Sequence, residues 1–317
     1  MRIVIVGYGE MFQALISGVL KTQHEIVGVF RQEYTTLNPI HRSIKDLLNP
    51  SSDYNFIRTH QLKEIKAKSV NSKEFIQALQ ELKTDLILVG SWGEKFSMQT
   101  INVPKKGCIN VHPSLLPKYR GPNPYIQVLL NNETKTGITF HQMDVNYDTG
   151  AIVHQTEIKI RPNDTGATLK LRCCDIARNE VTIFLNEFSK KMKNPISQNE
   201  KEATYQNQIT LGESIIDFTK ETAEEIDRRI RALTPWLQCH ICHNTEFFTF
   251  SNYKICPKNS KKPAGTIVKK TESSLFIVCK DGSVLEFSSV KLKRPLSNIL
   301  TKIYLEKFVK TNDKVVV

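Results

Sequence analysis

The residues with the clearest chemical potential lie in two loops near the middle of the chain. Asn110 and His112 stand two residues apart in a strand-like run, so their side chains emerge on the same face of that strand. The run breaks into a loop rich in proline and glycine, 113–124, and a second polar loop, 143–150, contains Asp148. Ligands of open α/β sheets bind at the carboxyl ends of the strands, so we expect the two loops to face each other there.

An asparagine, a histidine and an aspartate form a set suited to acyl transfer between two bound substrates. The amide of Asn110 can donate a hydrogen bond to a developing oxyanion. His112 can donate to the same oxygen or carry a proton. Asp148 can fix the tautomer of His112 and raise its basicity. No serine or cysteine nucleophile is assigned, so the nucleophile would belong to the acceptor substrate. The alternative is that the three side chains only satisfy hydrogen bonds of the loops.

Strands and helices alternate along the first 190 residues, which predicts a doubly wound, mostly parallel sheet. Short β-branched runs predict the strands, and amphipathic stretches predict the helices. Ser72 is the expected N-cap of the second helix. A surface loop with a helical piece is expected at 35–53. The expected strands are 2–6, 24–29, 86–89, 108–112, 136–143 and 152–160, and the expected helices are 11–20, 72–82 and 165–188.

The last third of the chain has a different pattern. A polar segment with a proline predicts a linker at 191–204, which separates a catalytic domain at 1–190 from a C-terminal domain at 205–317. The C-terminal domain is expected to contain a helix at 223–233. Evenly spaced short strands then predict a small β-barrel, with strands at 246–251, 265–269, 274–279 and 284–290.

Charge is concentrated in this C-terminal domain. The 317 residues carry a net charge of +12, and residues 251–317 contain fourteen Lys and Arg against five Asp and Glu, a net charge of +9. Such a segment favours contact with an anionic polymer, RNA first among candidates. The alternative is a solvated lysine-rich surface.

The chain shows no pattern of export or membrane insertion. No apolar run approaches the roughly 20 residues that span a bilayer, and the N-terminus lacks a signal-peptide pattern. We therefore expect a cytoplasmic protein without a membrane partner, whose seven cysteines are thiols.

Two further motifs suggest cofactors. The glycines of 7–9 follow the first strand as in a dinucleotide fingerprint, but Phe12 stands where that fingerprint needs its third glycine. A simple strand-to-helix turn is the favoured interpretation. Residues 239–243 spell C-x-x-C-H, a pattern of covalent haem and of zinc sites, but no second pair has matching spacing. An ordinary strand or loop is favoured there, and we predict no metal.

The two loops together resemble a known family. From Asn110 the chain reads N-x-H-x-S-L-L-P-x-Y-R-G-x-x-P, and from Met143 it reads M-D-x-x-x-D-T-G. This pattern is similar to that of the 10-formyltetrahydrofolate-dependent formyltransferases. The resemblance implies that Asn110, His112 and Asp148 are catalytic and that 10-formyltetrahydrofolate is the formyl donor. It also implies folate contacts from Ser114, Leu115, Leu116, Pro117, Val89 and Gly90.

The resemblance extends to the C-terminal domain and is closest to the methionyl-tRNA formyltransferases. Residues 264–267 and 279–282 resemble the barrel of those enzymes, which is similar to an OB-fold, and similar connecting segments lie at 203–205, 216–218, 229–232 and 235–236. This implies formyl transfer to the α-amine of methionyl-initiator-tRNA in translation initiation, with the initiator tRNA as partner. The alternative acceptor is a nucleotide-linked amino sugar. The oligomeric state stays open, with a monomer favoured.

One region departs from the tRNA-acting enzymes. They usually carry a glycine-rich, basic insertion after the second strand, and residues 31–45 lack it. Residues 7–10 also replace their Gly-Thr-Pro signature. These departures leave the acceptor open but not the donor.

Overall fold

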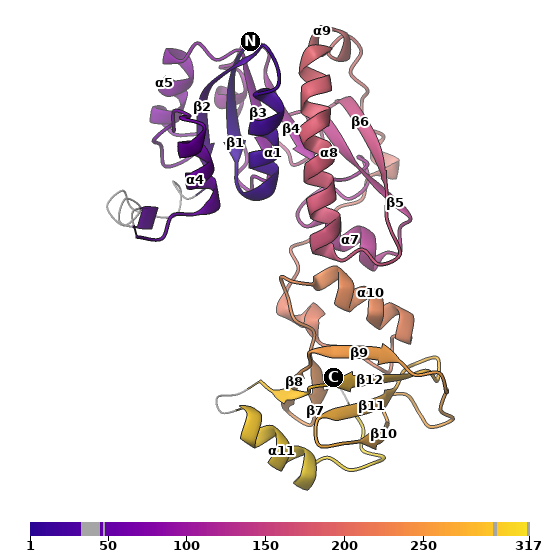
Figure 1. Cartoon of the computed structure of the whole chain (residues 1–317). Helices are drawn as coiled ribbons and strands as arrows, with labels where there is room; N and C mark the ends of the chain where they lie inside the picture. Colours follow the sequence, from indigo (N-terminus) through magenta and orange to yellow (C-terminus); the bar gives the residue numbers. More distant parts are fainter. Residues whose placement is uncertain (33–44, 47, 294–296, 316–317) are drawn as a thin grey trace. The chain divides into compact units, whose positions relative to one another are not determined.

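The computed structural model describes residues 1–32, 45–46, 48–293 and 297–315 (Figure 1). The chain forms two compact units. The first comprises Met1–Val128, Thr134–Arg161 and Thr168–Asn207, and the second comprises Leu129–Glu133, Pro162–Ala167 and Gln208–Val317. Residues 191–204, the expected linker, lie in the first unit.

A six-stranded sheet forms the centre of the first unit. Its strands lie in the order β2-β1-β3-β4-β5-β6. The first four are parallel, and β5 and β6 pair antiparallel. The predicted mostly parallel sheet is thus confirmed, with all six predicted strands present. Their bounds are β1 Arg2–Gly7, β2 Glu25–Arg31, β3 Leu86–Gly90, β4 Cys108–His112, β5 Lys135–Gln142 and β6 Ile152–Lys159.

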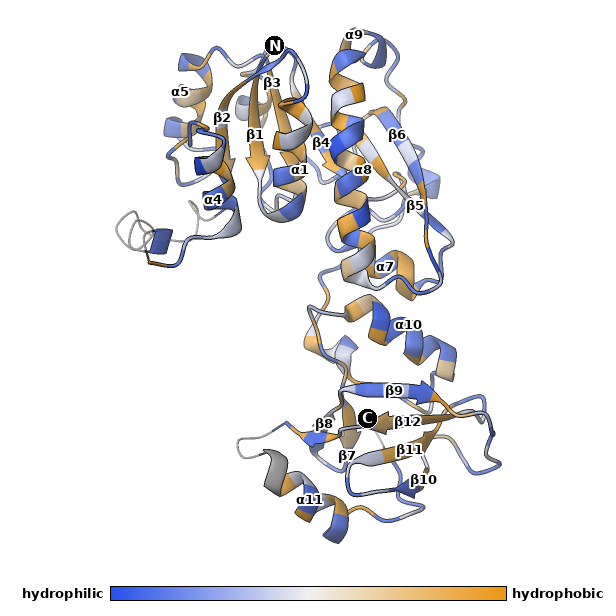
Figure 2. Cartoon of the chain, viewed as in Figure 1, coloured by the Kyte–Doolittle hydropathy of each residue, from blue (hydrophilic) through white to orange (hydrophobic). Residues whose placement is uncertain are grey.

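Helices cover both faces of this sheet because its strands are apolar on both sides. Figure 2 shows the apolar colouring of β1 and β3. On one face lie α1 (Gly9–Val19) and α8 (Gly166–Asn186), where the hydroxyl of Thr182 donates to the Gly18 carbonyl at 2.9 Å. On the other face, Phe75 of α5 (Lys73–Glu81) packs in a core cluster with Val4 and Val6.

These three helices confirm the predicted ones. Ser72 caps α5 as expected, since its hydroxyl accepts from the Phe75 N–H at 3.3 Å. Helix α4 (Ser52–Thr59) has no counterpart in the prediction; it is short, and only Asp53 and Ile57 of its eight residues are buried. A surface loop is expected at 35–53, and most of it lies outside the described residues. The same is true of residues 31–45, the segment that lacks the basic insertion. Three short helices were also not predicted: α6 (Met98–Ile101), α7 (Pro124–Leu130) and α9 (Phe188–Lys191).

The glycine turn after β1 is a packing feature. A Cβ on Gly7 would lie 2.2 Å from the carbonyl oxygen of Gly90 on the neighbouring strand. At the start of α1, the N–H of Gly9 donates to the Asp53 carboxylate at 2.7 Å, and the Gln13 amide donates to the same carboxylate at 2.7 Å. A protein carboxylate therefore stands where dinucleotide-binding folds place a phosphate.

The second unit is a small β domain built from two antiparallel sheets. The four-stranded sheet has the order β10-β11-β12-β9, and the three-stranded sheet has the order β13-β8-β7. The bounds are β7 Ile241–His243, β8 Glu246–Thr249, β9 Asn252–Ile255, β10 Ile267–Lys270, β11 Ser274–Val278, β12 Val284–Ser288 and β13 Lys291–Leu292. The predicted small β domain is confirmed.

A helix and an aromatic core complete this unit. Helix α10 (Ala223–Leu233) has the predicted bounds and begins with a capping box, in which Thr222 and Glu225 exchange hydrogen bonds. Phe287 packs edge-on against Phe218 and Phe250, with ring centroids 5.7 and 4.7 Å away. Strands β7, β9 and β13 are additional to the four strands predicted, as is helix α11 (Ser297–Lys307).

No helix within the described ranges is both long and apolar enough to cross a membrane.

Candidate active site

Strand β4 delivers two of the predicted site residues to the carboxyl edge of the sheet. Asn110 and His112 point to the same face of this strand, as their spacing predicts. The antiparallel neighbour β5 places His141 directly opposite Asn110. Asp148 lies in the connection between β5 and β6. The sheet therefore brings residues from three segments to one place.

A single carboxylate oxygen joins these side chains. Oδ1 of Asp148 accepts from Asn110 Nδ2 at 3.1 Å and lies 3.6 Å from His112 Nδ1. The same oxygen lies 3.4 Å from Nε2 of His141. The structure thus brings together all three residues predicted to be catalytic and adds a fourth.

The hydrogen bonds of His112 define which of its nitrogens can exchange a proton. Nε2 lies 2.8 Å from the carbonyl oxygen of Tyr119, which can only accept, so Nε2 carries a hydrogen. Nδ1, facing Asp148, is then the nitrogen whose protonation can change. The Tyr119 carbonyl, rather than Asp148, fixes the tautomer of the neutral ring.

Asp148 is held as an anion in an uncommon backbone conformation. Its φ is 57°, in the left-handed region, and its Oδ2 accepts from the Gly121 N–H at 2.8 Å. Burial works to raise the pKa of this carboxyl, but the charge of His112, the hydrogen bond and charge of His141 and the Gly121 N–H outweigh it. The pKa of Asp148 therefore lies well below its ordinary value, and the group stays ionised at neutral pH.

His141 is the site residue that sequence reasoning missed. Its Nδ1 lies 2.8 Å from the Gln142 carbonyl, so Nδ1 donates. In the neutral ring, Nε2 accepts from Asn110 Nδ2 at 3.1 Å. In the protonated ring, the form that lowers the pKa of Asp148, Nε2 instead faces Asp148 Oδ1 at 3.4 Å as a donor. The available signal was a histidine near the end of a predicted strand. Its meaning depends on the antiparallel register that pairs it with Asn110, and the sequence does not reveal that register.

The S-L-L-P loop, residues 114–117, packs against β5 and β6. The buried Ser114 hydroxyl donates to the Lys118 carbonyl at 2.8 Å, and Leu116 is 3% exposed. Thr139 and Gln155 hold the backbone of the loop, at 2.6 Å to the Ser114 carbonyl and 3.1 Å to the Leu116 carbonyl. Leu115 and Pro117 are partly exposed and are the members with accessible side chains. The folate contacts of this loop stay a prediction.

Val89 and Gly90 are the last two residues of strand β3, and other residues of the protein occupy the space on the side-chain side of both. Val89 is 2% exposed and lies in the core cluster with Phe30. A Cβ on Gly90 would lie 2.8 Å from Leu15. Any folate contact from these two positions would come from backbone atoms, and it too stays a prediction.

The C-x-x-C-H segment leads into β7, a strand of the second unit. Cys239 is 3% exposed, and burial raises its pKa to about 12, so its thiol stays protonated. Metals bind the thiolate. Nδ1 of His240 is hydrogen-bonded to the Ser214 hydroxyl at 3.2 Å. Among the residues that the structure describes, no group of three or more His, Cys, Asp and Glu could hold a metal ion.

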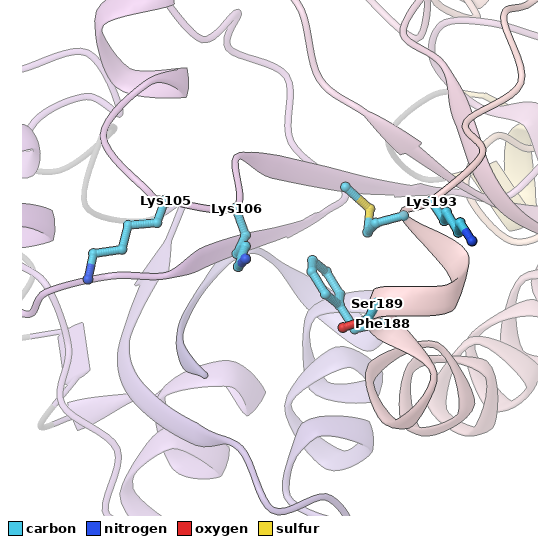
Figure 3. A pocket seen from close by; sticks show the side chains of 6 residues that line it. Lys105, Lys106, Phe188, Ser189 and Lys193 are labelled. Atoms are coloured by element: carbon cyan, nitrogen blue, oxygen red, sulfur yellow. The ribbon is translucent and has the colours of Figure 1, made fainter.

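A separate open pocket of about 460 Å³ lies at the opposite end of β4. Lys105 and Lys106 precede that strand, whereas His112 ends it. In Figure 3 the side chains of Lys105 and Lys193 extend away from each other. This hollow shares no residue with the candidate site. Its lining comprises Lys105, Lys106, Phe188, Ser189, Met192 and Lys193.

Family models match most of the chain. The formyl transferase model matches residues 1–186, and the model of the formyl transferase C-terminal domain matches residues 208–298. Among curated proteins, the methionyl-tRNA formyltransferase of Thermotoga maritima is 33% identical over 232 residues, which cover 73% of this chain and 72% of the relative.

Solved structures of two kinds of formyltransferase share the fold. The N-formyltransferase of Helicobacter canadensis, in complex with folinic acid and dTDP-3-aminofucose, has a TM-score of 0.64 at 19% identity, covering 91% of this chain and 99% of that one. The methionyl-tRNA formyltransferase of Clostridium thermocellum has a TM-score of 0.56 at 17% identity, covering 81% and 94%. The fold is therefore common to enzymes with different acceptors and does not identify the acceptor.

The site and the comparisons agree on one class of chemistry. The predicted transferase activity is confirmed at the level of the family. The predicted folate donor agrees with the folinic acid in the complex of the Helicobacter canadensis enzyme. Both family models, and a curated relative above 30% identity, match this chain. The chain belongs to the formyltransferase family.

Proposed function

We propose that this enzyme transfers a formyl group from 10-formyltetrahydrofolate to the α-amine of methionyl-initiator-tRNA. The main support for a tRNA acceptor is the 33% identity over 232 residues to a curated methionyl-tRNA formyltransferase. The match of residues 208–298 to the formyl transferase C-terminal domain supports the same assignment.

The reaction needs a nucleophile and a stabilised oxyanion. An α-amine has a pKa of about 8, so a fair fraction is neutral at pH 7. Its nitrogen attacks the formyl carbon and forms the new C–N bond. The tetrahedral intermediate then collapses, the bond to folate N10 breaks, and the proton lost by the amine goes to N10. Tetrahydrofolate leaves as the second product.

Within this proposal, the four site residues have distinct roles. Asn110 Nδ2 donates to Asp148 and His141, each at 3.1 Å, and substrate binding exchanges one of these bonds for a bond to the formyl oxygen. His112 stabilises the same oxygen and exchanges a proton at Nδ1. Asp148 orients His112 and stabilises its charged form. No metal takes part in these steps.

The basic second unit is the proposed binding surface for the tRNA. Among its lysines, Lys258, Lys261 and Lys269 are exposed. Lys270 differs from them, since its ammonium donates to the Leu305 and Val309 carbonyls at 2.5 and 2.6 Å near the end of α11. Lys270 is therefore a structural residue and is left out of the RNA surface. Arg294, also counted in the basic segment, lies outside the described residues.

A side-by-side assay tests the acceptor. Purified enzyme and 10-formyltetrahydrofolate are offered charged initiator tRNA, uncharged initiator tRNA and dTDP-linked amino sugars in separate reactions. We expect formyl transfer to the charged tRNA only. Turnover with the amino sugars and none with the charged tRNA would contradict the proposal.

A second acceptor class has one observation in its favour. Residues 31–45 lack the basic insertion typical of tRNA-acting relatives. A nucleotide-linked amino sugar would not need that insertion, because it is small enough to bind within the catalytic site. The same assay distinguishes the two.

A further inference from the structure

Arg120, in the loop after β4, is a fully buried cation with an unusual set of partners. Its side chain is 0% exposed. Its guanidinium donates to both carboxylate oxygens of Glu200 at 2.7 and 2.9 Å, and it stacks over the Tyr205 ring at 5.1 Å. The guanidinium also donates twice to Gln198 Oε1, at 2.8 and 3.1 Å. These partners come from residues 198–205, about 80 residues further along the chain.

Gln198 connects this buried cation to the Asp148 loop. Its Nε2 donates to the carbonyl oxygens of Asp148 and Gly150, at 2.8 and 2.7 Å. The guanidinium only donates and the two carbonyls only accept, so the amide can have just one orientation. Both donor hydrogens and the acceptor oxygen of Gln198 are engaged.

The segment around Gln198 is itself fixed to both catalytic loops. Ile196 exchanges two backbone hydrogen bonds of 2.8 Å with Ile152 at the start of β6. Further along, the Arg120 N–H donates to the Thr204 carbonyl at 2.8 Å, and the Gln206 N–H donates to the Arg120 carbonyl at 2.9 Å. We call residues 196–206 the strap, because it runs across the loop that contains Arg120 and the loop that contains Asp148.

Asp148 depends on such support. A residue other than glycine at φ 57° persists only where its surroundings fix the backbone. Its carboxylate must meet Asn110, His112 and the Gly121 N–H at once. Gln198 holds the carbonyl of the same residue, and so fixes the direction in which the carboxylate points.

We propose that Gln198 is a positioning residue for formyl transfer, which holds Asp148 against Asn110 and His112 by linking the Asp148 loop to Arg120. This inference rests on the proposed function, because it assumes that Asp148 acts in the reaction. Gln198 touches neither substrate in this account and acts through Asp148.

A pair of matched substitutions tests the link. Gln198→Glu keeps an oxygen for Arg120 but removes both donors to the Asp148 loop. Glu200→Gln is the matched control: it replaces a carboxylate by an amide at another partner of the Arg120 guanidinium and leaves Gln198 in place. We expect Gln198→Glu to lower kcat by about ten- to a hundredfold, with little change in the KM of folate or tRNA. Glu200→Gln should stay within about threefold of wild type, since its carboxylate is 66% exposed.

A double-mutant cycle shows whether Gln198 acts through Asp148. If it does, adding Gln198→Glu to Asp148→Asn should lower kcat by less than about twofold further. An undiminished loss in that background would overturn the inference. The inference would also be overturned if Gln198→Glu had the kcat of wild type while Asp148→Asn had a lowered kcat. If Gln198→Glu does not fold, Gln198→Met removes the same hydrogen bonds without adding charge, and the same expectations apply.

Failure of the proposed function has a different signature. A wild-type enzyme inactive with charged initiator tRNA, or an Asp148→Asn variant with wild-type kcat, contradicts the proposed function. NMR of the histidine rings then still tests the link without turnover. Gln198→Glu should shift the signals of His112 and His141, assigned with alanine variants, whereas Glu200→Gln should not. Unchanged signals in Gln198→Glu would overturn the inference.

Discussion

The two units of the chain use charge in opposite ways. In the first, Arg120 is fully buried and the side chain of Asp148 is only 11% exposed, and their charged atoms contact partners at fixed distances. In the second, lysines such as Lys258 and Lys261 are exposed to solvent. A buried network has one favoured geometry and responds to the loss of a single group, whereas exposed cations act as a set and are screened by salt. We therefore expect single substitutions to alter the chemistry and only combined ones to alter acceptor binding.

The largest effect should come from the buried site. Asp148→Asn removes the charge that joins Asn110, His112 and His141 while keeping the shape of the side chain. Loss of preorganised electrostatic stabilisation costs about 10²–10³ in rate, so kcat should fall by that factor. Asn110→Ala and His112→Ala should fall near the same range. Steady-state kinetics with saturating folate measures this, and near-wild-type kcat in any of the three would contradict the assigned roles.

Charge reversal in the second unit should change acceptor binding without changing the chemistry. Lys258→Glu, Lys261→Glu and Lys269→Glu together should raise the KM for tRNA at least about tenfold, because fewer phosphates are neutralised. The KM for folate and kcat at saturating tRNA should stay as in wild type.

A triple lysine-to-glutamate variant in the first unit serves as a control, because it changes the net charge by the same amount as the variant in the second unit. Lys105→Glu, Lys106→Glu and Lys193→Glu alter three exposed lysines around the hollow at the far end of β4. We expect this triple variant to keep the wild-type KM for tRNA within about threefold. Equal losses in the two triple variants would show that total charge, and not the second unit, governs acceptor binding.

The pH dependence of stability should reveal the anionic state of Asp148. Its pKa is lowered in the folded protein, so its contribution is present above the unfolded pKa of about 3.9 and is lost as pH falls through the lower folded value. The difference in the free energy of unfolding between wild type and Asp148→Asn should therefore persist down to about pH 5 and be lost only below about pH 4. Urea unfolding from pH 7 to about 3 measures it, and a difference that has already disappeared at pH 5 would contradict the lowered pKa.

The smallest expected effect separates two neighbouring leucines. Leu115 is partly exposed, whereas Leu116 is 3% exposed. Leu115→Ala should raise the KM for folate a few-fold more than that for tRNA and change stability little. Leu116→Ala should instead lower the free energy of unfolding by about 2–5 kcal/mol, as for other buried leucines. Equal KM values for folate in Leu115→Ala and wild type would contradict the prediction that this loop contacts the folate.

What the sequence could predict follows from how local each feature is. Asn110 and His112 share a strand face because they stand two residues apart, and the next polar loop supplies Asp148. Predicting the role of His141 requires knowing the antiparallel register of β5, which is a tertiary property. Predicting the role of Gln198 requires knowing its contact with Arg120, which stands 78 residues away in the sequence.

Local patterns also failed where burial is slight or decided by packing. Helix α4 is eight residues long and buries a single apolar side chain, that of Ile57, so its sequence offers little apolar surface from which to predict a helix. The S-L-L-P motif located a loop but not which of its side chains are accessible; those of Ser114 and Leu116 are buried.

The salt dependence of the reaction tests the central claim most directly: that chemistry resides in the buried network and acceptor binding in the exposed cations. The rate is measured at tRNA concentrations below KM, so that it reports kcat/KM, between about 50 and 200 mM salt. We predict a fall of orders of magnitude for wild type, a shallower slope for the triple reversal in the second unit, and no change in the KM for folate. A slope that is flat, or equal in the two proteins, would contradict the account.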